Sequence, residues 1–471
     1  MYSLYHSYRK VQHSYAVPMG MMLLDGGITY GAAMLAPKVG IDMAYGAETL
    51  RLLPTLLALS WMLWGLFMSL YEFESLNSYK KILTHSLTVS VFHVITLTLM
   101  IGAQSPVIGS LLTLMLFTAG GIVATRCLLL LVYRAFMKLP FHQRPCVIIG
   151  CNERGTRLFK SFQRQRDLPQ KFYGFFDDTP PTDPSLKPYY RGTIDQIEAY
   201  CLEYGVAEVY YALPNDRLQQ RRLRNFAEQN FIFFGMVPEI AEDMDTEKAR
   251  LDTHVLDDGR IAVISYRTNP LRHLLNAQVK RVFDFLFASV VLAILGVTLF
   301  PLIALAIRLD SPGPIFFKQM RAGRNFKPFP CYKFRTMRVN AEAHKKMATK
   351  NDARITRVGA FLRRTSLDEL PQFINVVRGE MSVVGPRPLM MSQAEDFTHS
   401  LSEFKSRHVV STGITGMAQV SGYRGEVNDL EHLQKRTAFD LWYAENWSLM
   451  LDLQIIGRTI QNVIRGDKKA Y

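Results

Sequence analysis

Hydrophobic residues form four long runs near the start of the chain, at residues 15–36, 52–71, 82–102 and 107–133. Each run approaches or exceeds the roughly 20 residues with which an α-helix crosses the hydrocarbon core of a bilayer. The pattern therefore predicts a bundle of four transmembrane helices within residues 1–140.

Basic residues predict the direction of these helices. They precede the first run, separate the second from the third and follow the fourth, at Arg9, Lys10, Lys80, Lys81, Arg134, Lys138 and Arg144. Because Lys and Arg are enriched on the cytoplasmic side of membrane helices, we expect the N-terminus in the cytoplasm and a return to it after four crossings. Asp25 and Arg126 lie inside the runs, where we expect contacts between helices rather than a transport path.

After Cys146 the pattern changes to short strands that alternate with helices. A buried strand at 147–149 is followed by a glycine-containing loop and a helix at 156–164, and later strands are expected near 175–178 and 209–214. This alternation predicts a small doubly wound sheet of Rossmann type over residues 141–250, followed by a linker at 251–279.

The loop after the first of these strands departs from the dinucleotide-binding pattern. Gly150 and Gly155 are present, but Asn152 stands where a second glycine would let the backbone approach a pyrophosphate. We therefore expect this domain to be a scaffold or a regulatory domain rather than an NAD site.

A fifth apolar run, residues 283–307, is also long enough to cross a membrane. Pro301 lies inside it, and proline disfavours a straight helix. Basic residues lie on both sides of the run, which places both of its ends in the cytoplasm. The pattern predicts a re-entrant helix hairpin that breaks at Pro301 and returns to the same face, with a kinked spanning helix as the alternative.

The acidic pair Asp368 and Glu369 lies just ahead of Pro371. Proline is favoured in the first turn of a helix, so a helix over 372–377 should begin close to the pair. Free backbone N–H groups at a helix start bind phosphate oxygens, which gives this position a chemical use. An acidic pair at such a position can equally be a helix cap.

Three basic residues should complete a pocket for phosphate beside the acidic pair. Arg387 follows a short strand at 383–384 and lies between Pro386 and Pro388, which stiffen the backbone around it. Its guanidinium matches two phosphate oxygens at once. Strand alternation places Lys333 and Arg335 on one face, where we expect them to assist Arg387.

Composition narrows the partners of this 471-residue chain. The net charge is +14, and hydrophobic residues make up 48% of the chain. Neither zinc-finger spacing nor an aromatic and basic platform accompanies this charge, so we expect contact with anionic lipid and a phosphorylated substrate, and no nucleic acid. The five cysteines lack paired or metal-ligand spacing, which indicates reduced thiols and a cytosolic face.

Residues 280–471 resemble the bacterial sugar transferases, the monotopic phosphoglycosyl transferases that start polysaccharide assembly on a polyprenyl phosphate. The resemblance lies in six segments in one order: KRVFDF, SPGPIFFKQMRAGR, YKFRTM, RRTSLDELPQFINVVRGEMSVVGPRP, GITGMAQVSGYRGE and FDLWYAENWSLMLDLQII. The four N-terminal runs and the Rossmann-like middle resemble the large members of this family, and the stretch 421–440 is most similar to the glucose-transferring kind.

The resemblance implies a two-step reaction and a role for each site residue. Asp368 would attack the β-phosphorus of a UDP-sugar and release UMP, and undecaprenyl phosphate would then take the sugar phosphate from Asp368. Glu369 would bind Mg²⁺ or handle a proton. The substrates' phosphates would contact Arg387, Lys333 and Arg335, with Arg364 and Asp440 as further candidates.

The resemblance also implies a place in the cell and leaves the sugar open. The catalytic domain, residues 280–471, would lie on the cytoplasmic face of a bacterial inner membrane, where it meets membrane lipid. The middle domain could support a homodimer. Glucose is the first candidate sugar and galactose the second. The family often has proline, tryptophan and proline where this chain has Thr412, Met417 and Ala353, so the loops near the sugar can differ.

Two other classes of protein remain as alternatives. A polytopic transporter would need more polar residues within its spans. A nucleotide-sugar oxidoreductase or epimerase would need a complete glycine loop and a Tyr-x-x-x-Lys pair after it.

Overall fold

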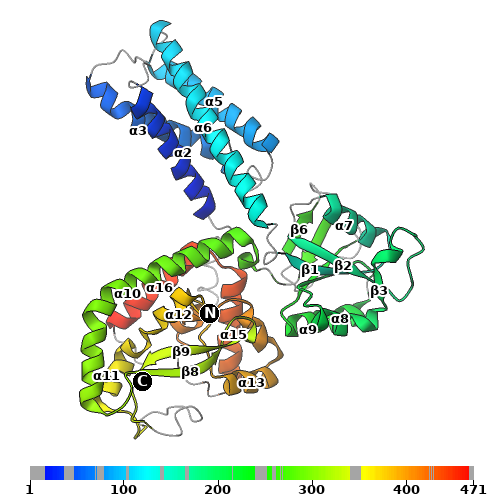
Figure 1. The fold of residues 1–471 in the computed structure, drawn as a ribbon, viewed down its shortest axis with the longest axis vertical. Coiled ribbons are helices and arrows are strands. Elements are labelled where there is room, and N and C mark those ends of the chain that lie inside the picture. The colour runs from blue at the N-terminus through cyan, green and yellow to red at the C-terminus, as the bar shows by residue number, and fades with distance from the viewer. Residues whose placement is uncertain are drawn as a thin grey trace. The chain divides into compact units, whose positions relative to one another are not determined.

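The protein is a mixed α/β chain, described here by a computed structural model (Figure 1). The described residues are 16–36, 47–68, 70–71, 79–101, 105–137, 143–164, 169–214, 216–238, 252–256, 261–265, 267, 269–339, 352–423, 425, 427 and 429–465. The chain divides into two compact units. One contains the four N-terminal helices, and the other comprises Arg144–Gln165 and Gln170–Tyr471.

The four predicted N-terminal helices are present as α2 (Ala16–Leu35), α3 (Ala47–Phe67), α5 (Tyr79–Ile101) and α6 (Ser105–Met137). Among the described residues, two stretches are long and apolar enough to cross a membrane, Thr113–Val132 of α6 and Leu275–Asp310 farther along the chain. A bundle with four crossings therefore stays a prediction.

The two charged residues inside the N-terminal runs form the expected contact between helices. Arg126 Nη2 on α6 donates to Asp25 Oδ2 on α2 at 2.5 Å, and both side chains are 1% exposed. Arg126 also donates to the carbonyl of Leu70. The pair thus ties α6 to α2 and to the end of α3, which explains two charges within apolar helices without a transport path.

The middle of the chain forms a seven-stranded sheet in the order β3-β2-β1-β4-β5-β7-β6. Its strands are β1 (Arg144–Ile149), β2 (Gln170–Phe176), β3 (Tyr190–Gly192), β4 (Glu208–Tyr211), β5 (Phe233–Met236), β6 (Asp252–Leu256) and β7 (Ile261–Ser265). The first five are parallel, in the Rossmann order 3-2-1-4-5. Strands β7 and β6 extend the sheet in antiparallel fashion, so part of the segment 251–279 that we expected to be a linker belongs to this sheet.

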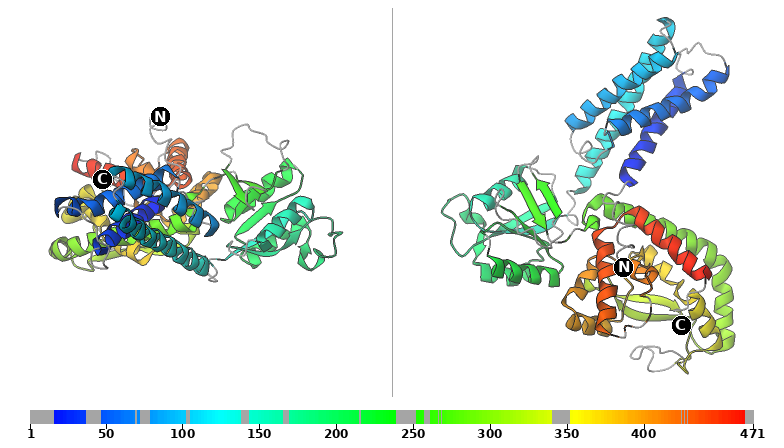
Figure 2. Two further views of the ribbon diagram at one scale, coloured as in Figure 1. Left: turned by 90° about the horizontal axis from the view of Figure 1, so that it is seen from above. Right: turned by 180° about the vertical axis from the view of Figure 1, so that it is seen from behind.

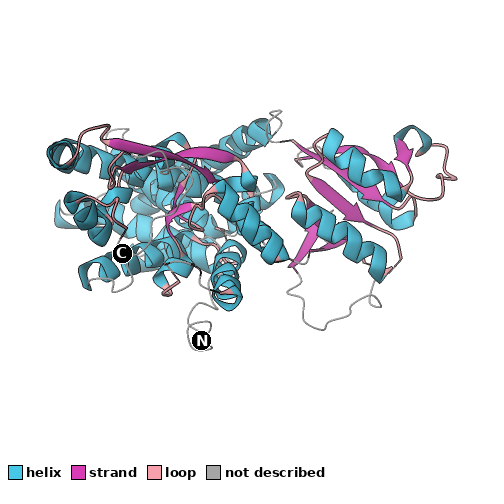
Figure 3. Ribbon diagram, turned by 90° about the horizontal axis from the view of Figure 1, so that it is seen from below, coloured by secondary structure: helices cyan, strands magenta, loops and turns pink. Residues whose placement is uncertain are grey.

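Helices cover both faces of this sheet (Figures 1 and 3). They are α7 (Glu153–Arg164), α8 (Ile197–Glu203) and α9 (Arg217–Gln229). Phe159 of α7 packs on Phe172 and Phe175. Ile197 of α8 and Leu223 of α9 pack with Phe176 in a separate core. Because Phe175 and Phe176 point to opposite faces, the sheet is doubly wound, as predicted.

The C-terminal part combines a long helix, short strands and an inner helical core. Its elements are α10 (Leu274–Asp310), β8 (Phe316–Ala322), β9 (Pro328–Phe334), α11 (Arg357–Thr365), α12 (Gln372–Arg378), β10 (Ser382–Val384), α13 (Met391–Ser400), β11 (Gly413–Thr415), α14 (Met417–Val420), α15 (Leu430–Glu445) and α16 (Leu449–Arg465). Short 3-10 turns lie at Pro270–Arg272, Arg324–Phe326, Leu367–Glu369 and Ser402–Val409. Two more lie in the middle of the chain, at Lys187–Tyr189 and Ile194–Gln196. β8 pairs with β9 in antiparallel fashion, and β10 pairs with β11 in parallel.

The predicted break at Pro301 is not present as an interruption of the helix. α10 is one helix of 37 residues with Pro301 inside it, and its ribbon bends around the C-terminal part without reversing (Figures 1 and 2). Ala288 packs in the main core near one end, whereas Ile303 and Ile307 pack with Phe334 near the other. A hairpin through one leaflet is thus not confirmed.

The outer face of α10 is apolar and exposed, at Val282, Phe285, Leu286, Val290, Ile294, Val297, Leu302, Leu305 and Leu309. A soluble protein rarely exposes a continuous apolar surface of this kind, which marks a site of contact with lipid or protein. The helix therefore has one side for the protein core and one for an apolar environment.

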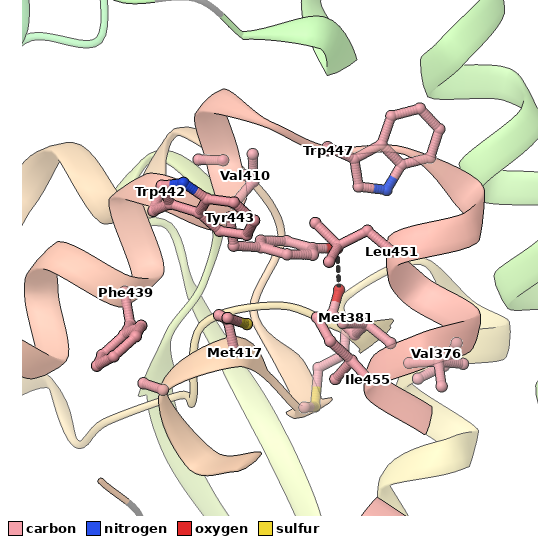
Figure 4. Close-up of a cluster of buried hydrophobic side chains, with 14 of the residues drawn as sticks. Val376, Met381, Val410, Met417, Phe439, Trp442, Tyr443, Trp447, Leu451 and Ile455 are labelled. Carbon is pink, nitrogen blue, oxygen red and sulfur yellow. Dashed lines mark hydrogen bonds between the residues drawn. The ribbon is translucent and has the colours of Figure 1, made fainter. Parts of the chain in front are cut away.

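The aromatic residues near the C-terminus form the main core rather than a belt at a membrane surface. Phe439, Leu441, Trp442, Tyr443, Trp447 and Leu451 are each at most 9% exposed. Five of them belong to one cluster with Met417 and Val384 (Figure 4). These side chains therefore hold the C-terminal part together from the inside.

Candidate functional site

The acidic pair lies in a tight turn between α11 and α12. Ser366 ends α11 in the left-handed conformation, with φ 60° and ψ 15°. A 3-10 turn, Leu367–Glu369, then leads into α12, which begins after Pro371 as predicted. The two carboxylates therefore emerge from a rigid turn, and both side chains are buried.

Glu369 is held by two cations. Its Oε1 lies 2.7 Å from Lys333 Nζ and 2.8 Å from Arg387 Nη2, and its Oε2 lies 3.3 Å from Arg387 Nη1. Burial alone would raise the pKa of Glu369, but Arg387 and Lys333 hold it well below the usual value. Glu369 is therefore a fixed negative charge. Lys333 and Arg387 keep 19% and 24% of their side-chain surface exposed, so they border the open side of the site.

Asp368 differs from its neighbour. It is 8% exposed, and among the described residues no hydrogen bond or ion pair reaches its carboxylate. Burial raises the pKa of Asp368, while the nearby charge of Lys333 acts in the opposite direction. The pair thus consists of one carboxylate held by two cations and one without a hydrogen bond or ion pair among the described residues.

The loop that carries Arg387 is fixed by close contact with β11. The N–H of Gly385 donates to Thr415 O at 2.8 Å, and the N–H of Gly413 donates to Pro386 O at 2.9 Å. A Cβ on Gly385 would lie 2.3 Å from the carbonyl oxygen of Ser411. Only glycine permits this approach, and the approach directs the Arg387 side chain toward Glu369.

Asp440 supports this loop from behind and does not contact the acidic pair. Its Oδ2 lies 2.8 Å from Arg407 Nη2, and both side chains are buried. The same Arg407 nitrogen donates to the backbone carbonyl of Arg387 at 3.0 Å. Asp440, which is a candidate for substrate contact, therefore pairs with Arg407, the residue that holds the backbone of Arg387.

Two predicted basic residues lie apart from the acidic pair. Arg335 donates to the carbonyls of Ser311 and Pro312 at 2.6 and 2.5 Å and so holds the turn after α10. β9 ends at Phe334, so the strand alternation that grouped Arg335 with Lys333 does not extend to it. Arg364 is exposed and lies over the ring of Phe361.

Arg321 and Arg363 lie near the site, and neither is among the residues that we predicted for it. Arg321 donates from Nη1 to Pro388 O at 3.0 Å, so it braces the far end of the arginine loop. Arg363 donates to Thr336 Oγ1, and its charge acts on Asp368. Arg321 belongs to the SPGPIFFKQMRAGR segment, but no spacing in the sequence links it to Pro388.

A buried charge cluster connects α10 to the strand that leads to Arg387. Lys280 Nζ lies 2.8 Å from Asp452 Oδ2 and 3.2 Å from Asp284 Oδ1. Asp284 accepts the N–H of Val383, and the Tyr443 hydroxyl donates to the carbonyl of Val384 (Figure 4). The cluster explains an acid at the entry of an apolar helix, because Asp284 faces the core and orders β10.

The loop after β1 uses the positions at which a nucleotide phosphate would bind. Asn152 Oδ1 accepts the N–H of Gly155, and its Nδ2 donates to Ala212 O. Asp177, at the end of β2, accepts the N–H of Cys151. Whether this domain is a scaffold, a regulatory domain or a ligand site stays a prediction.

The residues at the acidic pair fit a magnesium ion only together with a substrate. Within the described ranges, no group of three or more His, Cys, Asp or Glu residues is placed to hold a metal. Glu369 Oε2, however, has only the 3.3 Å contact with Arg387, and Asp368 lies beside it. Mg²⁺ is commonly bound by one or two carboxylates and by substrate phosphates, so this pair suits an ion that arrives with a diphosphate.

Comparison with known proteins agrees with the geometry. The family model for bacterial sugar transferases matches residues 275–466, and a model described as a CoA-binding domain matches residues 68–228. A UDP-glucose:undecaprenyl-phosphate glucose-1-phosphate transferase of Klebsiella pneumoniae is 34% identical over 347 residues, which is 73% of each chain.

Two further relatives bear on the choice of sugar. A transferase of the same name from Xanthomonas campestris pv. campestris is 38% identical over 59% of this chain and 57% of its own. A UDP-N-acetylgalactosamine-undecaprenyl-phosphate N-acetylgalactosaminephosphotransferase of Aeromonas hydrophila is 38% identical over 44% of this chain and 50% of its own. Relatives with different sugars are thus similarly distant.

Proposed function

The chain belongs to the bacterial sugar transferase family and is an undecaprenyl-phosphate sugar phosphotransferase of exopolysaccharide synthesis, and we propose that it acts through a covalent intermediate on Asp368. The donor is a UDP-sugar, with UDP-glucose as the first candidate because several relatives carry that name. The acceptor is undecaprenyl phosphate.

The reaction consists of two displacements at one phosphorus atom. A carboxylate oxygen of Asp368 forms a bond to the β-phosphorus of the UDP-sugar, the bond from that phosphorus to the bridging oxygen breaks, and UMP leaves. A phosphate oxygen of undecaprenyl phosphate then attacks the same phosphorus, and the bond to Asp368 breaks. The products are a lipid-linked diphosphate sugar and the regenerated carboxylate.

The contrast between the two neighbouring carboxylates carries this proposal. Glu369 is neutralised by Lys333 and Arg387, whereas no described residue bonds to Asp368. An anchored carboxylate is a poor nucleophile because its lone pairs are occupied. An unengaged carboxylate that is surrounded by cations can attack an anionic phosphate, since Lys333 and Arg387 reduce the repulsion between the two.

Magnesium is part of the proposal, with Glu369 as its protein ligand and Asp368 beside it. The ion would neutralise charge on the diphosphate oxygens of the donor. Lys333 and Arg387 hold Glu369 in place and keep it ionised, so the carboxylate is ready to meet the ion. Activity should be lost in a chelator and restored by added Mg²⁺.

We place the enzyme at the cytoplasmic face of a bacterial inner membrane. The exposed apolar side of α10 supports contact with lipid, and undecaprenyl phosphate has its phosphate at that surface. The four N-terminal helices would be membrane spans. The re-entrant path of α10, a homodimer and the domain limits 1–140, 141–250 and 280–471 are further parts of the proposal.

Retention of radiolabel on the protein tests the covalent step. Membranes that contain the protein are incubated with UDP-glucose labelled in the β-phosphate, without undecaprenyl phosphate, and the protein is then denatured and counted. We expect one labelled protein species, UMP in solution, and no label with Asp368→Asn. Undiminished labelling of that variant, or UDP as the product, would refute the proposal. Other UDP-sugars in the same assay identify the donor.

A further inference from the structure

Arg436 of α15 is a buried arginine that has no carboxylate partner among the described residues. Its side chain is 3% exposed, and no described carboxylate lies within ion-pair distance of it. The nearest acid on the same helix, one turn on, is Asp440, and that carboxylate pairs with Arg407 at 2.8 Å. Two buried arginines therefore share one carboxylate, and the charge of Arg436 is the one left over.

The unpaired charge comes with unpaired hydrogen-bond donors. Nη2 of Arg436 is buried and has no partner among the described residues, and the same holds for Nε and Nη1 of Arg407. Buried donors of this kind are rare in native proteins, and those that persist often mark the place of an ion or ligand. A buried charge without a partner carries a still larger desolvation cost. An anion would remove both costs.

Arg436 is linked to the Arg387 loop through Asp440, which lies one turn on along α15: Asp440 pairs with Arg407, and Arg407 donates to the carbonyl of Arg387 at 3.0 Å. Burial lowers the pKa of Arg436 to about 9, and the charges of Arg407 and Arg387 add to the effect while Asp440 opposes it. Arg387 in turn binds Glu369. Arg436 therefore belongs to the buried group of charges that supports the loop of Arg387 and acts electrostatically with it.

The charges of the whole site also require an anion. The acidic pair and its support contain the carboxylates Asp368, Glu369 and Asp440 and the cations Lys333, Arg321, Arg363, Arg387, Arg407 and Arg436. Asp352 also acts on Arg363, but it is paired with Arg354 and does not change the balance. Lys333 and Arg387 already neutralise Glu369, and Arg407 neutralises Asp440. The surplus of positive charge suits a substrate that has more than one phosphate group.

The proposed chemistry indicates which phosphate this is. In an in-line displacement, the leaving group departs opposite the attacking oxygen. UMP therefore leaves from the side of the phosphorus opposite Asp368. Undecaprenyl phosphate must attack from that side, which UMP has left, in order to displace Asp368. Both groups are phosphate monoesters, so one subsite can serve both steps in turn.

We propose that Arg436, beside Arg387, forms a second phosphate subsite, which binds the phosphate of UMP in the first step and that of undecaprenyl phosphate in the second. This inference rests on the proposed function. It assigns the subsite to Arg436, to which neither the sequence nor the family resemblance gave a role.

Two kinetic constants, measured on the full-length protein in detergent micelles, test the subsite. They are the inhibition constant of UMP and the KM for undecaprenyl phosphate, each for Arg436→Gln, Arg436→Lys and the wild type. We expect Arg436→Gln to weaken both by at least tenfold, as for the loss of one charged hydrogen bond. Arg436→Lys, which keeps the charge, should recover part of each loss.

The matched control is Lys435→Gln, which removes a positive charge from the adjacent position of α15. Lys435 keeps 38% of its side-chain surface exposed and pairs with Glu431, so neither constant should change. A loss confined to one of the two ligands would overturn the shared subsite, and unchanged constants in Arg436→Gln would make Arg436 a structural residue. Thermal unfolding shows whether Arg436→Gln folds. If it does not fold, Arg436→Lys replaces it: the lysine keeps the charge but loses the guanidinium donors, so both constants should still weaken, by less than for Arg436→Gln.

The two proposals fail in different ways. UMP binding does not depend on a covalent bond to Asp368, so the subsite can be tested even if no label is retained on the protein. Conversely, retained label with unchanged UMP and lipid constants would leave the intermediate intact and remove only the subsite.

Discussion

Lys333 Nζ lies 2.7 Å from Oε1 of Glu369. Arg387 contacts the same carboxylate, and neither cation forms an ion pair with Asp368. This asymmetry gives two adjacent acids different chemistry. Glu369 is ionised and immobile, and Asp368 is buried but unengaged. Lys333 still affects Asp368 through its charge, because it lowers the pKa that burial raises.

Lys333→Met should move the acid limb of the pH profile of kcat/KM to higher pH. Asp368 must be ionised to attack, and burial already raises its pKa. Removal of Lys333 takes away a charge that lowers this pKa, so the carboxylate stays protonated to a higher pH. The measurement is UMP release as a function of pH. Lys318→Met is the control, because Lys318 is exposed on β8 over the ring of Tyr332, and its profile should match the wild type. A limb that does not move in Lys333→Met would contradict the assignment.

Arg335→Ala should lower stability and leave substrate binding unchanged. Arg335 binds the carbonyls of Ser311 and Pro312, and loss of these bonds should cost about 1–3 kcal/mol for each carbonyl left without a partner. The midpoint of thermal unfolding should fall, while the KM for the UDP-sugar should not rise. A large rise in KM without a loss of stability would show that Arg335 binds the substrate phosphates instead.

Asp440→Asn should destabilise the protein more than removal of the whole ion pair does. The substitution leaves Arg407 buried without a full countercharge, which costs about 3–5 kcal/mol for a buried pair. The double variant Asp440→Leu with Arg407→Met removes both charges and should unfold at a higher temperature than Asp440→Asn. It should still turn over slowly, because Arg407 no longer supports the carbonyl of Arg387. Equal unfolding temperatures for the two variants would show that the pair carries no such penalty.

Tyr443→Phe should loosen the strand that leads to Arg387. The hydroxyl donates to Val384 O and lies 2.8 Å from Asp452 Oδ1. Val384 O also accepts the hydroxyl of Ser382, so the main loss is the contact with the buried Asp452 oxygen, at a cost of about 1–3 kcal/mol. We expect a lower unfolding midpoint and a reduced kcat. Tyr423→Phe is the control, since Tyr423 packs through its ring on Phe439 and His432. The same loss in both variants would indicate general weakening of the core.

Local patterns were enough for the secondary structure around the site. Proline at position 371 predicted the start of α12, and the paired valines predicted β10. Alternation of strands and helices predicted a Rossmann-type sheet with strands near β1, β2 and β4, but it located neither β3 and β5 nor the antiparallel pair β6 and β7. Those two strands were missed because the stretch was assigned to a linker, and an antiparallel extension of a parallel sheet has no strong local signal.

The sequence by itself determined which residue types meet at the site, since Asp368, Glu369, Lys333 and Arg387 were all expected there. Only the tertiary structure decided which carboxylate is neutralised, because that depends on distances of a few ångströms between β9, the arginine loop and the turn before α12. The tertiary structure also decided that Arg335 binds the carbonyl of Ser311 after α10 and that Asp440 pairs with Arg407. Charge type is encoded locally, but pairing follows from how distant segments pack, and the strength of each pair depends on its burial.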